Sequence, residues 1–185
     1  SMIASPFFYA AIGGFVPSLI WLFFWLMEDR EHPEPKLSLV LAFFAGGLAI
    51  PLALMLEWSW QEFLKNSIVL TEERFVLVLL VGYALIEEAA KFALVRSVIF
   101  WRREFDEPVD AMVYLITAAL GFASVENVLY LSTQFQDNFA VGLRTGNLRF
   151  VGATLLHALS SGVLGYFIAH SFYRKRFKKA RAILL

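Results

Sequence analysis

Long apolar runs separated by short polar stretches dominate this chain of 185 residues. Roughly 20 apolar residues of helix cross a bilayer core, and five runs reach that length, so each is predicted to be a transmembrane helix. Gly46, Gly47 and Pro51 are predicted packing or kink points in the second run. The five segments run from about Pro6 to Met27, Leu37 to Leu56, Arg74 to Trp101, Pro108 to Leu131 and Asn147 to His170.

The stretches between these segments are predicted to be loops or membrane-surface structure. The stretch 28–36 contains two prolines and 132–146 is polar, so both are predicted to be loops. Residues 58–72 combine Trp58 and Trp60 with apolar and charged residues, a pattern typical of an interfacial helix. The predicted fold class is an all-α, polytopic transmembrane helix bundle of about five spans.

The composition also favours a membrane protein. The chain is 59% hydrophobic with a mean hydropathy of +0.64, whereas a soluble domain of this length needs a more polar surface. There is no cysteine, which excludes a thiolate nucleophile and a cysteine-ligated metal. The first segment has no basic region before it and no cleavage site after it, so we expect a retained anchor.

Basic residues predict how the chain is oriented. The loops at 28–36 and 102–107 and the C-terminal tail carry ten Lys and Arg residues, whereas the opposite side carries four. The positive-inside rule therefore predicts an N-terminus outside and a C-terminus in the cytoplasm. We predict a single transmembrane domain over 6–170, followed by a basic cytoplasmic tail over 171–185.

Ionisable side chains lie within three of the apolar segments, where a charge is costly unless it is paired or hydrated. They are Glu87, Glu88 and Lys91 in the third segment, Glu126 in the fourth and His157 in the fifth. These side chains are expected to face the bundle interior or a water-filled cavity. Helical spacing lets Lys91 pair with either Glu87 or Glu88, which leaves the other carboxylate free for chemistry.

Two carboxylates and an imidazole around water suit hydrolysis, because a buried glutamate can act as the general base. Glu126 and His157 could orient the water, bind a Lewis-acid metal such as zinc, or donate to a developing oxyanion. Ser161, one turn after His157, and Asn127 are expected to be hydrogen-bonding partners. Arg149 is expected to snorkel or pair near the outer surface.

The sequence lacks the motifs of three known classes of intramembrane protease. The fifth segment reads His157-Ala-Leu-Ser-Ser161, which is not HExxH. An aspartyl protease needs two intramembrane aspartates, and only Asp110 lies near a span. A pair of Ser124 or Ser160 with His157 lacks a rhomboid-like GxSx sequence.

Two functions outside proteolysis stay open. In a proton- or ion-coupled carrier, Glu87, Glu126 and His157 would form a relay. Against a carrier, the chain is small and shows no internal repeat. In a non-catalytic membrane scaffold or immunity-type protein, the same polar residues would hold the helices together.

The polar residues form ordered motifs that resemble a known family. Glu87-Glu88-Ala-Ala-Lys91 matches EExxK, Phe122-Ala-Ser-Val-Glu126-Asn127 matches FxxxEN, and His157 stands on the third expected helix. In this order the motifs resemble the PrsW-type intramembrane peptidases of bacteria. That family is distantly similar to the CAAX prenyl-protein endopeptidases and the bacteriocin-immunity proteins. The resemblance covers about residues 75–165.

The resemblance implies an endopeptidase of the bacterial inner membrane that cuts membrane-anchored proteins, in the best-known case an anti-sigma factor at its extracytoplasmic side. No nucleic-acid partner is expected. The resemblance implies Glu87 and Glu88 as the base and its partner, Glu126 as a water- or metal-binding group, and His157 as a ligand or oxyanion donor, with Lys91, Asn127 and Ser161 in support.

The resemblance leaves the metal open. Zinc held by Glu126 and His157 is one expectation. The CAAX endopeptidases commonly have His where Glu126 stands, and Asn or Asp where Ser161 stands. A metal-free glutamate mechanism is therefore the other expectation.

Overall fold

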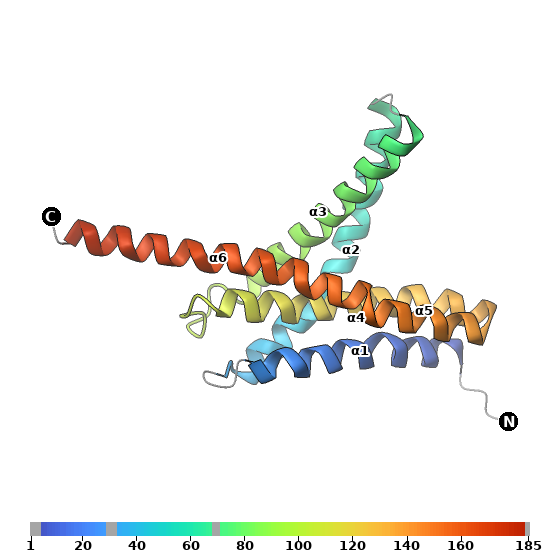
Figure 1. Ribbon diagram of the computed structural model, residues 1–185, viewed down its shortest axis with the longest axis horizontal. Coiled ribbons are helices and arrows are strands. Elements are labelled where there is room, and N and C mark those ends of the chain that lie inside the picture. The colour runs from blue at the N-terminus through green and yellow to red at the C-terminus, as the bar shows by residue number, and fades with distance from the viewer. Residues whose placement is uncertain (1–4, 29–32, 68–70, 184–185) are drawn as a thin grey trace.

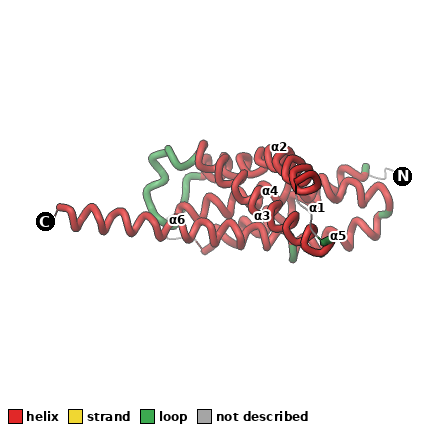
Figure 2. Tube along the Cα trace, turned by 90° about the horizontal axis from the view of Figure 1, so that it is seen from above, coloured by secondary structure: helices red, strands yellow, loops and turns green. Residues whose placement is uncertain are grey.

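The computed structural model describes residues 5–28, 33–67 and 71–183, apart from the side chains of Glu28, Ser67 and residues 172–183. Every regular element in this part of the chain is a helix (Figure 1, Figure 2). The helices are α1 (Pro6–Glu28), α2 (Lys36–Ser67), α3 (Glu72–Val98), α4 (Asp110–Asp137), α5 (Phe139–Val151) and α6 (Ala153–Ile183). The prediction of an all-α bundle is confirmed.

Helix α4 is the centre of the bundle. It contacts each of the other five described helices, and every side chain from Tyr114 to Ser124 is buried. Helices α1, α5 and α6 run along α4, whereas α2 and α3 form a hairpin whose closed end projects obliquely away from it (Figure 1). Polar side chains on α4 therefore meet other helices and are kept from lipid.

Glycines allow α2 to cross α4 at close range. A Cβ added at Gly46 would lie 1.8 Å from the backbone oxygen of Ala118, and one at Gly121 would lie 1.9 Å from that of Phe43. Small residues at such crossings let two helix backbones touch in a membrane. The prediction that Gly46 is a packing point agrees with this contact, which fixes α2 beside Phe122.

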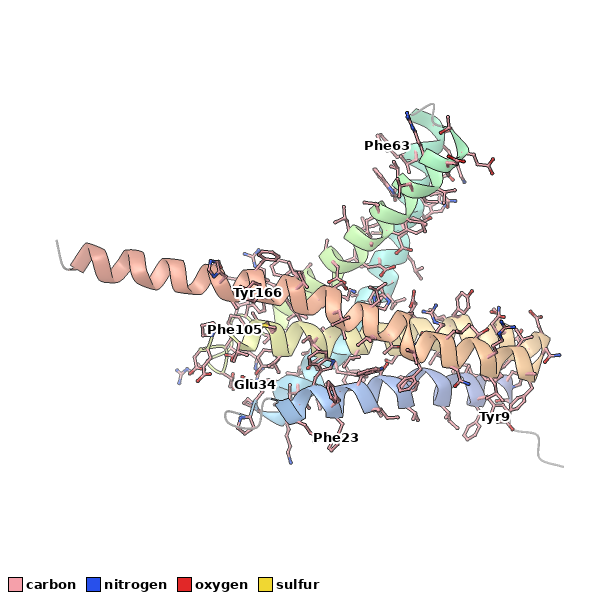
Figure 3. All side chains as sticks on the ribbon, in the orientation of Figure 1. Tyr9, Phe23, Glu34, Phe63, Phe105 and Tyr166 are labelled. Carbon is pink, nitrogen blue, oxygen red and sulfur yellow. The ribbon has the colours of Figure 1, made fainter. Side chains whose placement is uncertain are left out.

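Large apolar side chains cover the outer faces of the bundle. Phe7 and Phe23 of α1, Leu48 of α2 and Phe167 of α6 are 65%, 68%, 66% and 65% exposed. Phe23 projects away from the other helices (Figure 3). A continuous apolar exterior of this kind suits lipid and not water.

Four described segments are long and apolar enough to cross a membrane. They are Pro6–Met27, Lys36–Asn66, Asp110–Asp137 and Phe139–Ser171. The chain is therefore a multi-pass membrane protein. Helix α3, the third predicted span, is not among the four, because Glu87, Glu88 and Lys91 interrupt its apolar sequence. A fifth span remains a prediction.

Two polar stretches differ from what the sequence predicts. Residues 58–67 continue α2 without a break, and Trp60 packs against Gly82 of α3, so they do not form a separate interfacial helix. Residues 68–70 of that prediction lie outside the described part. The stretch 132–146, predicted to be a loop, is helical apart from Asn138: α4 continues to Asp137, and α5 begins at Phe139.

The side of the membrane on which each helix end lies stays a prediction. The C-terminal end of α1 and the loop 99–109 lie toward the same end of the bundle, and α6 projects beyond them in the same direction (Figure 1, Figure 2). Helix α6 continues without a break through residue 170 to Ile183. The domain boundary at residue 170 therefore stays a prediction. Arg30 and the six basic side chains of the tail, on which the predicted orientation partly depends, lie outside the described part.

Candidate active site

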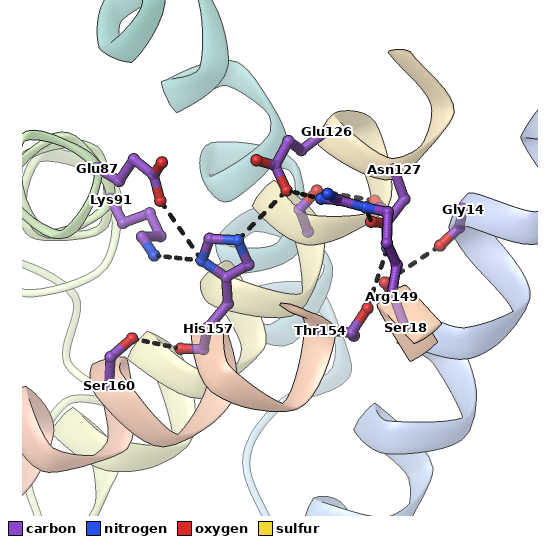
Figure 4. A network of polar contacts seen from close by, with 12 residues as sticks. Gly14, Ser18, Glu87, Lys91, Glu126, Asn127, Arg149, Thr154, His157 and Ser160 are labelled. Carbon is purple, nitrogen blue, oxygen red and sulfur yellow. Dashed lines mark hydrogen bonds and ion pairs between the residues drawn. The ribbon is translucent and has the colours of Figure 1, made fainter. Parts of the chain in front are cut away.

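The predicted polar residues of three helices meet beside α4. Glu87 comes from α3, Glu126 from α4 and His157 from α6, and the imidazole lies between the two carboxylates (Figure 4). His157 Nδ1 is 3.6 Å from Glu87 Oε2, and His157 Nε2 is 3.3 Å from Glu126 Oε2. The structure thus gathers residues that lie 70 positions apart in the sequence. Their catalytic roles remain predictions.

Lys91 pairs with Glu88. Its side chain is 0% exposed, and its ammonium group donates to Glu88. The Glu88 carboxylate also accepts hydrogen bonds from Ser160 Oγ at 2.8 Å and from Ser161 Oγ at 2.7 Å. Glu88 is therefore occupied in joining α3 to α6. Of the two pairings that helical spacing allows, the structure shows the one with Glu88.

Contacts on both ring nitrogens determine the tautomer of His157. Lys91 Nζ lies 3.2 Å from His157 Nδ1, and an ammonium group can only donate, so Nδ1 must be the acceptor. In a neutral imidazole the proton then sits on Nε2, which donates to Glu126 across 3.3 Å. The contact with Lys91 therefore favours the neutral tautomer whose Nε2–H faces the Glu126 carboxylate, while Glu87 Oε2 also faces Nδ1 at 3.6 Å.

Phe122, the first residue of FxxxEN, covers one side of this polar group. Its ring centroid lies 5.3 Å from that of His157 and 4.8 Å from Lys91 Nζ, and the residue is 2% exposed. The ring excludes water from that side and stabilises the buried ammonium through its π face. The aromatic residue of the motif therefore has a direct structural role in the site.

Arg149 of α5 holds the other side of the site. Its guanidinium group donates to the Glu126 carboxylate through Nη2 and to the Asn127 side-chain oxygen through Nε. Asn127 Nδ2 in turn donates to Thr154 Oγ1 of α6 at 3.0 Å. The sequence predicted that Arg149 snorkels or pairs near the outer surface; the structure shows a pairing, with Glu126, which the sequence did not identify as the partner. The sequence did predict Asn127 as a hydrogen-bonding partner.

A cavity of about 370 Å³ adjoins the carboxylates. Its walls come from α2, α3 and α4, and they include Glu87 and Glu126. Leu54, Leu129 and Tyr130 at its edge are each at least half exposed, so the cavity opens at the surface of the bundle. At this volume the cavity can hold water beside the two carboxylates.

Glu57 of α2 is a third carboxylate in this cavity. Its carboxylate lies near that of Glu87 and close enough to Glu126 for their charges to interact. The sequence analysis left Glu57 between the second span and the stretch 58–72 and did not assign it to the site. The signal was present, since Glu57 directly follows the apolar run 37–56 on a helix that contains no proline after Pro51.

The Ser161 hydroxyl offers a test of the Glu88 anchor. We expect Ser161→Ala to lower the free energy of unfolding by about 1.5–3 kcal/mol, as loss of a hydrogen bond to a charged group does, because Ser161 is fully buried. Urea unfolding in detergent micelles measures the change. Ser171→Ala is the matched control, since Ser171 is exposed on α6 and bonds only a backbone oxygen. Equal stabilities of the two variants would contradict the anchor.

Comparisons with known proteins agree with these motifs. The family described as PrsW family intramembrane metalloprotease matches residues 34–185. The protease PrsW of Oceanobacillus iheyensis is 31% identical over 168 residues, which cover 88% of this chain and 71% of that protein. The protease PrsW of Clostridioides difficile is 26% identical over 91% of this chain and 68% of its own length.

The protease PrsW of Bacillus subtilis is 27% identical over 84% of this chain and 65% of its own length. No solved structure matches the chain. The family match covers most of the sequence, including every residue of the EExxK and FxxxEN motifs and His157. The chain belongs to the PrsW family of intramembrane metalloproteases.

Proposed function

We propose that this intramembrane protease hydrolyses a peptide bond of membrane-anchored proteins with water activated by Glu87. The observation that supports the proposal is that Glu87 and Glu126 line one cavity whose other walls are mainly apolar, and that His157 lies between their carboxylates. Water is scarce in a bilayer core, so a hydrolase there needs a polar hollow that brings water to a base.

Glu87 is the better base of the two adjacent glutamates. Lys91, Ser160 and Ser161 bond to Glu88, whereas no described ammonium or hydroxyl group hydrogen-bonds to Glu87. Its carboxylate faces both the cavity and His157. A carboxylate in this position is available to take a proton from water.

The proposed reaction has two proton transfers. Glu87 takes one proton from water while the water oxygen attacks the carbonyl carbon of the substrate, which produces a tetrahedral oxyanion. The Nε2–H of His157, which faces Glu126 before substrate binds, leaves that carboxylate and donates to the oxyanion. Glu87 then gives its proton to the leaving nitrogen as the carbon–nitrogen bond breaks, and a carboxylic acid and an amine are released. Glu126 binds and orients the water, and Glu88 and Lys91 hold α3 against α6.

The family description implies a metal ion, so we compared the donors of this site with a zinc site. Catalytic zinc usually has three protein ligands. Among the described side chains no group of three His, Asp or Glu residues is close enough to hold an ion. Glu126 Oε2 also accepts from Arg149, and the lone pair of His157 needed for zinc is on Nδ1, which faces Lys91. The arrangement does not fit the predicted zinc site at Glu126 and His157.

Chelation tests this disagreement. We expect cleavage of a reporter to persist after a membrane-permeant chelator is added, because the proposed steps use side chains alone. A zinc protease assayed in the same vesicles is the control for complete chelation. Loss of cleavage that zinc restores would show that a metal completes the site and would contradict the mechanism.

The proposed setting is the bacterial inner membrane, with the N-terminus outside and the C-terminus in the cytoplasm. The C-terminal end of α1 and the loop 99–109, which lie toward the same end of the bundle, and α6, which projects beyond them in the same direction, support this orientation. In that setting the substrate is a membrane-anchored protein such as an anti-sigma factor, and the lipid bilayer surrounds both proteins. A transmembrane domain over 6–170 with a basic tail is part of the proposal.

Reconstitution with a single-pass reporter protein in lipid vesicles tests the function itself. A peptidase releases a fragment of the reporter, and mass spectrometry of the fragment identifies the bond that is cut. An ion-coupled carrier would give ion flux without a fragment, and a scaffold would give neither. Intact reporter in the presence of folded protein would reject the proposed substrate class.

A further inference from the structure

We propose that Arg149 is a positioning residue that holds Glu126 in the geometry needed for hydrolysis. The inference rests on the proposed function and adds to the site a side chain that lies outside the EExxK and FxxxEN motifs. It begins from the contacts of the guanidinium group, which reach the last two residues of FxxxEN from a different helix.

The guanidinium group of Arg149 matches its two acceptors. Its Nη2 and Nε point in fixed directions, and they donate to Glu126 and to Asn127, which are adjacent on α4. The Tyr130 ring lies one turn further along α4, 4.7 Å from Arg149 Cζ, and stacks on the guanidinium. The planar guanidinium group has donors in fixed directions, so it can hold the side chains of Glu126 and Asn127 in place together. The single ammonium group of a lysine lacks this fixed arrangement of donors.

Burial makes this contact important for Glu126. The side chain of Arg149 is 17% exposed, and that of Glu126 is 32% exposed. A carboxylate on an apolar helix in these surroundings needs a nearby positive charge to stay ionised and in one position. Arg149 supplies that charge to the same carboxylate oxygen that contacts His157, so the second oxygen of Glu126, a residue that lines the cavity, bonds neither of them.

The local backbone explains how Arg149 reaches the site. Asn138 caps α5 by accepting hydrogen bonds from the backbone nitrogens of Ala140 and Val141, and the helix ends at Val151 before Gly152. Arg149 therefore stands in the last turn of α5, beside the first turn of α6, which carries Thr154. The break at Gly152 lets α5 and α6 contact the same part of α4 with different side chains.

The test compares Arg149→Ala, Arg149→Lys and the control Arg144→Ala in the reporter assay. Arg144 lies on the same helix and is exposed. We expect kcat of Arg149→Ala to fall roughly 10²-fold, as for a misplaced catalytic group, with Arg149→Lys in between and Arg144→Ala unchanged. Added guanidinium ion should partly restore kcat of Arg149→Ala, an effect that a purely structural role would not produce.

A double variant shows whether Arg149 acts through Glu126. We expect Arg149→Ala to cost little further activity on a Glu126→Gln background, because the carboxylate it holds is already gone. Losses that multiply, failure of guanidinium to rescue, or an Arg149→Ala kcat equal to wild type would each overturn the inference. Cleavage by the wild type and its loss in Glu126→Gln test the proposed function separately, so the two failures can be told apart.

Discussion

Glu87→Gln is expected to lower kcat by roughly 10²–10⁴-fold, the range for loss of a general base. The amide keeps the size of the side chain but cannot accept a proton from water. The amide also stays next to His157 without introducing a new charge, so we expect the Glu87→Gln protein to fold. The measurement is the rate of reporter cleavage in lipid vesicles, with unfolding in detergent as a check on stability.

Glu62→Gln is the matched control for this prediction. Glu62 makes an exposed ion pair with Lys65 on α2, at 3.0 Å, and exposed pairs of this kind contribute little to stability. We expect its cleavage rate to equal that of the wild type. If Glu88→Gln abolished cleavage in a folded protein while Glu87→Gln did not, the base would be Glu88 and the proposed mechanism would be wrong.

The helices and their charged residues could be predicted because both follow from local properties of the chain. The thickness of a bilayer sets the length of an apolar run, and the cost of a charge in lipid forces Glu87, Glu126 and His157 inward. Neither the length of an apolar run nor the cost of a charge in lipid depends on which helices are neighbours. The sequence therefore predicted which residues gather but not their individual contacts.

The partner of Lys91 shows where sequence reasoning stops. Glu87 and Glu88 are both within reach of Lys91 on α3, at four and three residues. The choice depends on Ser160 and Ser161, which arrive from α6 and bond to Glu88. A contact over more than 70 positions cannot be derived from helical spacing, so the roles of the two glutamates could be separated only in the structure.

The partner of Arg149 was missed for a different reason. The stretch 132–146 has the polar composition of a loop, and a loop there puts Arg149 at the membrane surface. Asn138 carried a contrary signal, because asparagine is a favoured N-cap and apolar residues follow it. Reading that cap would have predicted α5 and placed Arg149 in its last turn. The glycine at 152, which follows that turn, is a typical helix terminator.

His157→Gln and His157→Ala together test the proposed oxyanion donor. Alanine removes the donor, and we expect kcat to fall roughly 10²–10³-fold, as for the loss of one oxyanion donor. Glutamine carries both an acceptor for Lys91 and a donor for Glu126, so it can keep the network of His157. We therefore expect Gln to retain more activity than Ala, although less than the wild type.

The same pair of variants separates a donor from a metal ligand. A glutamine amide is a poor substitute for an imidazole that binds zinc, so a metal site predicts that Gln is as inactive as Ala. Nitrogen NMR of the labelled imidazole gives an independent reading, since a Lys91 ammonium that donates to Nδ1 requires the proton of a neutral His157 ring to be on Nε2. Equal inactivity of two folded variants, or a proton found on Nδ1 of a neutral ring, would contradict the donor role. Greater activity of the Gln variant together with a proton on Nε2 would support it, because glutamine preserves the hydrogen bonds of His157 but not a zinc-binding imidazole.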